Sequence, residues 1–143
     1  MAVTRLMSMH INEGRSVLQC FQDRTNYAMN PKKNREGELV SSYLCVPQTA
    51  AAEFDLARRT YLTLTGRYRK DEVIAYQLRQ SFKPGEITPE DANALGCELA
   101  KRFLHGDHAY IVATHIDKAH IHNHIIFCAT AVDCQHKFRN FLC

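Results

Sequence analysis

The sequence predicts an α+β fold in which a sheet is packed against helices. Runs of alternating or β-branched apolar residues, typical of strands, take turns along the chain with longer stretches of helical character. The last two apolar runs, 109–115 and 122–130, are joined closely. The predicted order is therefore β-α-β-α-β-α-β-β, which favours a mostly antiparallel sheet with helices on one face.

The composition is that of one soluble domain. The chain has 143 residues, 45% of them hydrophobic and 23% charged, with a net charge of +3. This size permits a real core, and the mild positive charge permits a nucleic-acid partner without demanding one. No apolar run reaches membrane-spanning length and the first residues do not form a signal peptide, so we expect a cytoplasmic protein. The six cysteines have neither a CxxC pair nor disulfide-framework spacing, which predicts reduced thiols.

Four elements are predicted in the first half of the chain: a strand at 2–10, a helix at 17–27, a strand at 39–45 and a helix at 49–67. Pro31 ends the first helix, because the residue before a proline is pushed out of helical geometry. Thr49 is the expected cap of the second helix. A solvated face and phosphate contact are equally open interpretations of the basic residues near its end. These residues are Arg58, Arg59, Arg67, Arg69 and Lys70.

The second half begins with a clear strand at 72–82. Thr88 then opens a helix with a threonine cap, a proline in the first turn and acidic residues at the positive end of the helix dipole. Gly106 ends this helix. Its predicted buried stripe consists of Leu95, Leu99 and Phe103. Residues 135–143 have the character of a fragment of a further element, so we expect residues 1–143 to be a single domain of a longer protein, its N-terminal domain or a piece of it.

The segment from His115 to His124 indicates the chemistry. Four of the eight histidines of the chain fall within it, together with Asp117. Because strand side chains alternate between faces, His122 and His124 point the same way, and a short connection brings His115 beside them. Three imidazoles converging from two strands predict a catalytic metal site with open positions. Asp117 is well placed to hold the second nitrogen of a ligating histidine, while His120 is interpreted as a bystander or a substrate contact.

Three segments resemble motifs of relaxases, the HUH-type nicking enzymes that mobilise conjugative plasmids and transposons. The segment His115-x-Asp117-x-x-His120-x-His122-x-His124 looks like their metal motif. The segment Asp23-Arg-Thr-Asn-Tyr27-Ala-Met-Asn-Pro31-Lys-Lys resembles their nucleophile motif. The segment Gln80-Ser-Phe-Lys-Pro-Gly-Glu86-Ile-Thr-Pro resembles their middle segment. The similarity spans roughly residues 3–140, and the three motifs in this order are specific.

The resemblance implies a five-stranded antiparallel sheet of the split βαβ type. It also implies a metal-dependent DNA endonuclease in which Tyr27 attacks a phosphodiester of single-stranded DNA at an origin of transfer. The products would be a 5′-phosphotyrosine link and a free 3′-hydroxyl. By position, His115, His122 and His124 would bind a divalent metal. The family leads us to expect magnesium or manganese, although imidazole also suits zinc, nickel or cobalt. Accessory mobilisation proteins are possible further partners.

The physical chemistry of phosphodiester cleavage supports these roles. A divalent cation held by neutral imidazoles can polarise the phosphate and stabilise its oxyanions. Tyrosine has a pKa of about 10, so it needs a base or a nearby cation to lose its proton. Asp117, His120 or a metal-bound water could accept that proton. From position alone Tyr27 is barely ahead of Tyr43 and Tyr68, and the resemblance is what favours it.

Basic residues near the motifs are candidates for contacts with DNA phosphates. Such contacts give salt-dependent affinity but no sequence choice. The candidates are Lys32, Lys33, Arg35, Arg79, Lys83 and Lys118.

One departure from the family pattern and two alternatives stay open. Asn123 is polar where the HUH name implies a hydrophobic residue, but it points to the opposite face, so the metal site should survive. The run His120-Ile-His122-Asn-His124-Ile-Ile also resembles the histidine-triad motif of nucleotide hydrolases and transferases, which would work without metal. The other alternative is a non-catalytic DNA-binding or replication-accessory domain.

Overall fold

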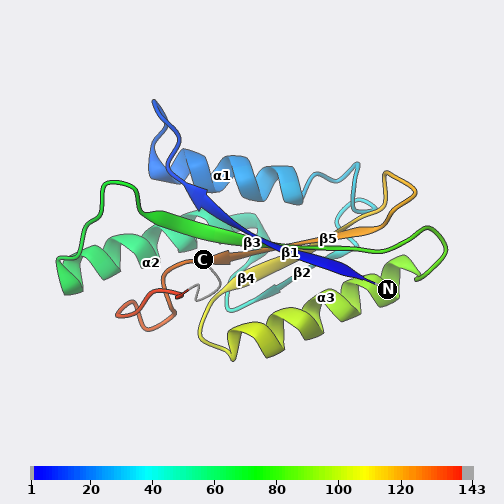
Figure 1. The fold of residues 1–143 in the computed structure, drawn as a ribbon. Helices are drawn as coiled ribbons and strands as arrows, with labels where there is room; N and C mark the ends of the chain where they lie inside the picture. The colour runs from blue at the N-terminus through cyan, green and yellow to red at the C-terminus, as the bar shows by residue number, and fades with distance from the viewer. Residues whose placement is uncertain (1, 140–143) are drawn as a thin grey trace.

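The computed structural model describes residues 2–139 and has a five-stranded antiparallel sheet with three helices packed on it (Figure 1). The elements are β1 (Val3–His10), α1 (Val17–Ala28), β2 (Val40–Tyr43), the short 3-10 turn η1 (Pro47–Thr49), α2 (Ala50–Thr65), β3 (Val73–Ser81), α3 (Pro89–Leu104), β4 (Tyr110–His115) and β5 (His122–Cys128). The predicted α+β fold is confirmed, and so is the order of its strands and helices.

Strand order and register bring the histidine segment to the middle of the sheet. The order is β1-β3-β5-β4-β2, so β5 is the central strand. His115 lies opposite His122 across β4 and β5, and His124 lies opposite Arg79 of β3. Directly opposed residues of antiparallel strands point to the same face. The register therefore gathers these four side chains on one face of the sheet.

Helices cover both faces of the sheet, and the expectation of helices on one face is wrong. On one face, Phe21 of α1 and Ile126 of β5 belong to a buried cluster that also includes α2. On the other face, Leu104 of α3 packs with Ile125 and Phe127. Figure 1 shows α1 and α3 on opposite sides of the sheet. Because the residues of β5 after His124 are all apolar, from Ile125 to Cys128, each face of this part of the strand needs a cover of its own.

α3 approaches the sheet closely because small residues line its inner face. Those residues recur every four positions and end in a leucine: Ala92, Gly96, Ala100 and Leu104. The predicted stripe is therefore wrong at Leu95, which is 47% exposed. Leu99 and Phe103 are partly buried at the border of the cluster instead of forming its centre.

α2 differs from the prediction at both ends. The hydroxyl of Thr49 donates to the carboxylate of Glu53, and its side chain accepts no hydrogen bond from the helix backbone. The helix ends at Thr65, earlier than expected, and is followed by Gly66 with a φ of +67°. Glycine adopts this left-handed conformation without steric penalty, and the turn it makes closes the helix.

Some sequence expectations concern thiols and chain ends. The cysteines at 20, 45, 97, 128 and 134 are free thiols, as predicted. Positions 140–143 of the predicted terminal element, which include the sixth cysteine, Cys143, lie outside the described residues. None of the helices within residues 2–139 combines the length and apolarity that crossing a bilayer requires.

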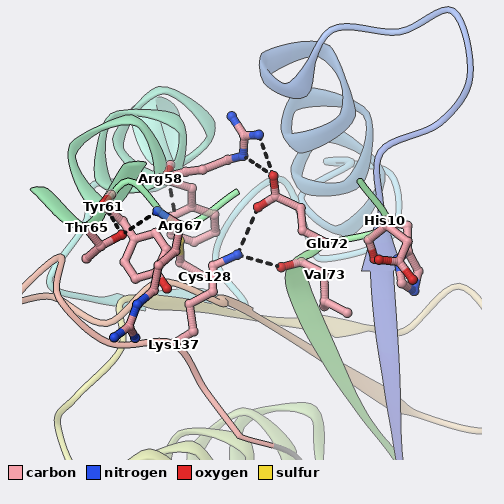
Figure 2. Close-up of polar contacts among 11 residues, drawn as sticks. His10, Arg58, Tyr61, Thr65, Arg67, Glu72, Val73, Cys128 and Lys137 are labelled. Atoms are coloured by element: carbon pink, nitrogen blue, oxygen red, sulfur yellow. Dashed lines mark hydrogen bonds and ion pairs between the residues drawn. The ribbon is translucent and has the colours of Figure 1, made fainter. Parts of the chain in front are cut away.

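A buried carboxylate ties α2 to the start of β3 and to the residues after β5 (Figure 2). Glu72 accepts hydrogen bonds from Arg58 Nε at 3.1 Å and from Lys137 Nζ at 2.9 Å. The side chains of Glu72 and Arg58 are only 3% and 11% exposed. Burial raises the pKa of Glu72, but the hydrogen bonds from Arg58 and Lys137 outweigh it, so the pKa lies below its ordinary value. Arg58 is therefore part of the interior and not of a phosphate-binding surface.

Replacing Glu72 with Gln should lower the free energy of unfolding by about 3–5 kcal/mol at pH 7, because Arg58 then keeps a buried charge without its counter-ion. A carboxylate whose pKa is lowered by folding adds stability above its unfolded pKa of about 4.3. That contribution is lost as the pH falls through the folded value. The difference between the two proteins in urea unfolding should therefore shrink from pH 7 toward pH 3.

Glu98→Gln is the matched control, because Glu98 forms an exposed pair with Arg102. It should cost less than about 1 kcal/mol. A difference between Glu72→Gln and the parent protein that stays constant with pH would contradict the ion-pair explanation.

Candidate active site

The last turn of α1 brings a tyrosine against the histidines of the sheet. The ring centroid of Tyr27 lies 6.0 Å from that of His115 and 6.1 Å from that of His124. Tyr27 is 57% exposed, so it is not sealed in the interior. Tyr43 and Tyr68 are also exposed, but neither has a ring contact with a histidine within residues 2–139. Of these three tyrosines, Tyr27 is therefore the one that lies at the histidines.

Both ends of α1 are fixed by hydrogen bonds. At the start, Ser16 and Gln19 form a reciprocal capping box. At the end, the carbonyl of Ala28 accepts a hydrogen bond from Nε2 of His115 at 2.7 Å. Carbonyls in the last turn of a helix lack partners within the helix, and His115 supplies one. This bond holds the turn that carries Tyr27 against β4.

Three histidines gather at this point, although at unequal spacing. The ring centroids of His115 and His124 are 4.0 Å apart, and those of His122 and His124 are 6.4 Å apart. Burial lowers the pKa of His115 and of His122. The pKa of His124 falls to about 3, because the ring is buried and because His115 and Arg79 lie close to it. The three imidazoles are therefore neutral near pH 7, which is the form that binds metal ions.

Two features of these rings fit a divalent metal ion. Nδ1 of His124 is buried and has no hydrogen-bond partner, an arrangement that is costly unless something binds the nitrogen. His115 donates from Nε2, so its Nδ1 keeps a free lone pair, and metal-binding histidines typically have such a bond on the other nitrogen. Within residues 2–139, however, no three His, Cys, Asp or Glu side chains converge closely enough to hold an ion. The donor chemistry of the three imidazoles fits a metal ion, but in this structure the three rings do not converge on a single ion position.

Asp117 does not occupy the place that the sequence suggests. The carbonyl of Ala28, not this carboxylate, holds the second nitrogen of His115. Asp117 instead pairs with Lys33, whose Nζ lies 2.9 Å from Oδ2. The hydrogen bond from Lys33 lowers the pKa of Asp117, so the carboxylate stays ionised. The expectation is wrong because a backbone acceptor on α1 competes for the same ring nitrogen.

Lys33 places its ammonium group over the tyrosine ring. Its Nζ lies 5.5 Å from the ring centroid of Tyr27. The loop that carries it is held in place, because the backbone N–H of Ile116 donates to the carbonyl of Lys33 at 2.7 Å. The buried side chain of Asn34 adds a second bond, accepting from the N–H of Gly37 at 2.9 Å. A positive charge is thus positioned beside the phenol.

The other predicted site residues are engaged in different ways. Arg79 is exposed and lies directly opposite His124. Arg35 forms ion pairs with Glu90 and Glu38. His120 lies in the β4–β5 connection, where its Nδ1 is 3.2 Å from the carbonyl of Phe82. The other three lysines predicted to contact DNA are exposed and form no ion pair within residues 2–139: Lys32, Lys83 and Lys118.

Asn123, between two of the histidines, is fully buried on the opposite face beneath α3. Its Nδ2 donates to the side chain of Gln80 at 2.9 Å and to the carbonyl of Ala92 at 2.6 Å. Its Oδ1 accepts from the hydroxyl of Thr114 at 2.6 Å. One side chain therefore links β5 to β3, β4 and α3. This explains why a polar residue is accommodated at a position where the family name implies a hydrophobic one.

Gly96 is the residue of α3 that makes room for this amide. A Cβ atom built at Gly96 would lie 2.7 Å from Nδ2 of Asn123 and 2.9 Å from a methyl group of Val112. Sequence analysis missed its role. The available signal was a single glycine inside a helical pattern, which often marks a close approach.

Comparison with known proteins identifies the family. A family model described as a MobA/VirD2-like relaxase nuclease domain matches residues 27–142. "Protein rlx" of Staphylococcus aureus is 38% identical over 89 residues, which cover 62% of this chain and 28% of that protein. The "Group II intron-interrupted relaxase LtrB" of Lactococcus lactis subsp. cremoris (strain MG1363) is 32% identical over 124 residues, 73% of this chain and 22% of that protein. The chain belongs to the MobA/VirD2-like relaxase family.

The chain spans a minor part of these relatives. A further "Protein rlx" of Staphylococcus aureus is 35% identical over 116 residues, which are 81% of this chain but 33% of that protein. What the family match covers is the nuclease domain, with the proposed nucleophile at its first residue and the histidine segment within it.

The substitution Gly96→Ala should destabilise the protein by about 1–3 kcal/mol, because the added methyl group overpacks the contact with Asn123. Helix propensity alone predicts the opposite sign, since alanine is better than glycine by about 1 kcal/mol. Urea unfolding measures the difference. Ala94→Gly, at an exposed position of the same helix, is the control and should lose only the propensity difference. A Gly96→Ala protein that is more stable than the parent would show that α3 can move away from Asn123 freely.

Proposed function

We propose that the chain is a relaxase domain that nicks single-stranded DNA at an origin of transfer, with Tyr27 as the nucleophile. The observation that carries the proposal is the contact of an exposed tyrosine with two histidines, at centroid distances of 6.0 and 6.1 Å. The phenol oxygen would form a bond to phosphorus while the bond to the 3′-oxygen breaks. The products are a 5′-phosphotyrosine link and a free 3′-hydroxyl, which takes up the proton that balances the one lost by the phenol.

The surroundings of Tyr27 suit this attack. A phosphodiester is an anion that repels a negatively charged nucleophile, so positive charge near the reacting atoms lowers the barrier. Lys33 supplies such a charge 5.5 Å from the ring centroid. The helix end that carries Tyr27 is tied to His115 of β4, and the loop that carries Lys33 is tied to Ile116, the residue after β4. The group that accepts the phenol proton is proposed to be Asp117, His120 or a water molecule.

His115, His122 and His124 would hold a divalent cation, magnesium or manganese by family expectation, with zinc, nickel and cobalt also compatible. When bound, the cation supplies charge that polarises the phosphate and stabilises oxyanions. Burial lowers the pKa of these histidines and keeps their imidazoles neutral, which is the form that binds a metal ion. The carbonyl of Ala28 fixes which nitrogen of His115 remains free.

DNA would be held through phosphates on both sides of the cut. Exposed lysines without ion pairs in residues 2–139 support this, because they can bind phosphate without losing another partner: Lys32, Lys83 and Lys118. Arg35 would first have to release Glu90. Accessory mobilisation proteins and a cytoplasmic location belong to the same proposal. The histidine-triad alternative is less well supported, since it gives no role to His115 or Tyr27.

Tyr27→Phe should abolish the covalent protein–DNA adduct while leaving DNA binding nearly unchanged, because only the attacking oxygen is removed. The assay incubates the protein with single-stranded origin DNA of its own element and Mn²⁺, then detects a band that survives denaturation. Mass spectrometry maps the attached residue. Tyr68→Phe removes the hydroxyl of an even more exposed tyrosine (66%) and should leave the adduct intact. Adduct formation by the Tyr27→Phe protein would rule out this nucleophile, and DNA binding without any adduct would favour the accessory domain.

Metal removal distinguishes the relaxase from the histidine-triad alternative. EDTA should abolish adduct formation, and Mn²⁺ should restore it. His124→Ala should weaken Mn²⁺ binding, measured by titration calorimetry, by more than about 10-fold, since loss of even an outer partner of a ligand has an effect of that size. His136→Ala, at an exposed histidine that pairs with Asp133, is the control and should bind Mn²⁺ like the parent. Cleavage that persists in EDTA would support metal-free chemistry.

A further inference from the structure

A row of basic residues runs from the histidines to the edge of the sheet. His124 of β5 lies opposite Arg79 of β3, and Arg79 lies opposite Arg5 of the edge strand β1. Opposed residues of antiparallel strands point to the same face. Both guanidinium groups therefore extend from the face on which His115, His124 and Tyr27 meet.

Neither arginine is neutralised by the protein. Arg5 and Arg79 are exposed, and within residues 2–139 their side chains form no ion pair and no hydrogen bond. Several arginines elsewhere on the surface are paired, including Arg15 with Asp23 and Arg102 with Glu98. Like charges directly opposite each other destabilise a sheet. Two exposed guanidinium groups that lack a counter-ion and lie next to each other can bind an anion, because the anion offsets their mutual repulsion.

The face of the sheet is open at these two positions. Toward the other end of the same strands, Met9 of β1 and Ala75 of β3 are buried in the cluster that includes Phe21 of α1. Arg5 and Arg79 lie beyond that cover and are exposed. An extended anionic chain can therefore reach both side chains from solvent, next to the end of α1 that carries Tyr27.

We propose that Arg5 and Arg79 bind neighbouring phosphates of the DNA strand, so that the strand leaves the cut site by crossing β3 and β1. The inference rests on the proposed function, because it gives the path of the DNA at the same site. Guanidinium groups suit this role, since they stay charged and bind phosphate oxygens through two parallel hydrogen bonds. Adjacent strands are about 5 Å apart, and the long arginine side chains can spread further to reach successive phosphates. Of these two arginines, sequence analysis identified only Arg79 as a candidate for DNA binding, because the position of Arg5 beside it depends on strand register.

The test uses the salt dependence of DNA binding, because each neutralised phosphate releases counter-ions whatever the base sequence. The full chain with Tyr27→Phe, which prevents covalent capture, is titrated with a fluorescent mixed-sequence single strand of about 30 nucleotides between roughly 50 and 200 mM NaCl. Arg5→Gln and Arg79→Gln should each reduce the slope of log K against log salt by about 0.7, and the double variant by about 1.4. Arg102→Gln removes the same charge from α3, on the other face, and should leave the slope unchanged.

Unchanged slopes in both single variants would overturn the inference, and so would an equal reduction in the Arg102→Gln control. Thermal melting separates folding from binding. Since each Gln variant relieves repulsion between two opposed charges, it should melt at or above the temperature of its parent. Arg5→Lys and Arg79→Lys keep the charge and should retain the slope while losing part of the affinity.

Adduct formation by the unmodified protein is measured in parallel. An adduct together with unchanged slopes refutes the phosphate path and keeps the nicking proposal. Reduced slopes without any adduct keep the phosphate path and refute the nicking proposal.

Discussion

The hydrogen bonds of one buried amide, that of Asn123, hold the centre of this fold in a single arrangement. Both of its N–H groups and its oxygen are used, by Gln80, Ala92 and Thr114. The Thr114 hydroxyl in turn accepts a bond from Asn93. A buried amide is costly when unpaired, so a shift of β5 by one residue would leave several polar groups without partners and turn the histidines to the wrong face. The register that presents His122 and His124 is therefore enforced from the opposite side of the sheet.

The backbone around Tyr27 is held by a different means, through two carbonyls that accept hydrogen bonds from the end of β4 and from the residue that follows it. The carbonyl of Ala28 accepts from His115, and that of Lys33 accepts from the N–H of Ile116. These bonds hold the end of α1 and the following loop without burying the Tyr27 ring. The result is a fixed backbone that carries an exposed side chain, an arrangement that suits the proposed attack on a large, extended substrate. The same bond that positions the helix also sets which nitrogen of His115 is free, so the positions of the proposed nucleophile and of the candidate metal ligands are coupled.

Much of this arrangement could be predicted from the sequence, and the rest depends on contacts that local patterns do not encode. The two-residue spacing of His122 and His124 follows from strand geometry, and the start of α3 follows from Thr88 and Pro89. The inner face of α3 was mispredicted because hydrophobicity favours Leu95, whereas the close approach to Asn123 selects Gly96. The role expected of Asp117 went to the carbonyl of Ala28, and a backbone acceptor has no signature in side-chain identity. The helices on both faces did have a signal, the uninterrupted apolar run after His124, which is typical of a strand buried on both sides.

Electrostatics explains why such a site is left open to solvent. Lys33 and Arg79 add positive charge around imidazoles that burial keeps neutral, and Arg5 extends that charge to the edge of the sheet. The carboxylate of Asp117 balances Lys33 alone. Without an anion, the opposed arginines repel each other across neighbouring strands. On the proposed path, a polyanionic strand would remove that repulsion as it binds, so this surface would gain more from DNA than an already neutralised surface could.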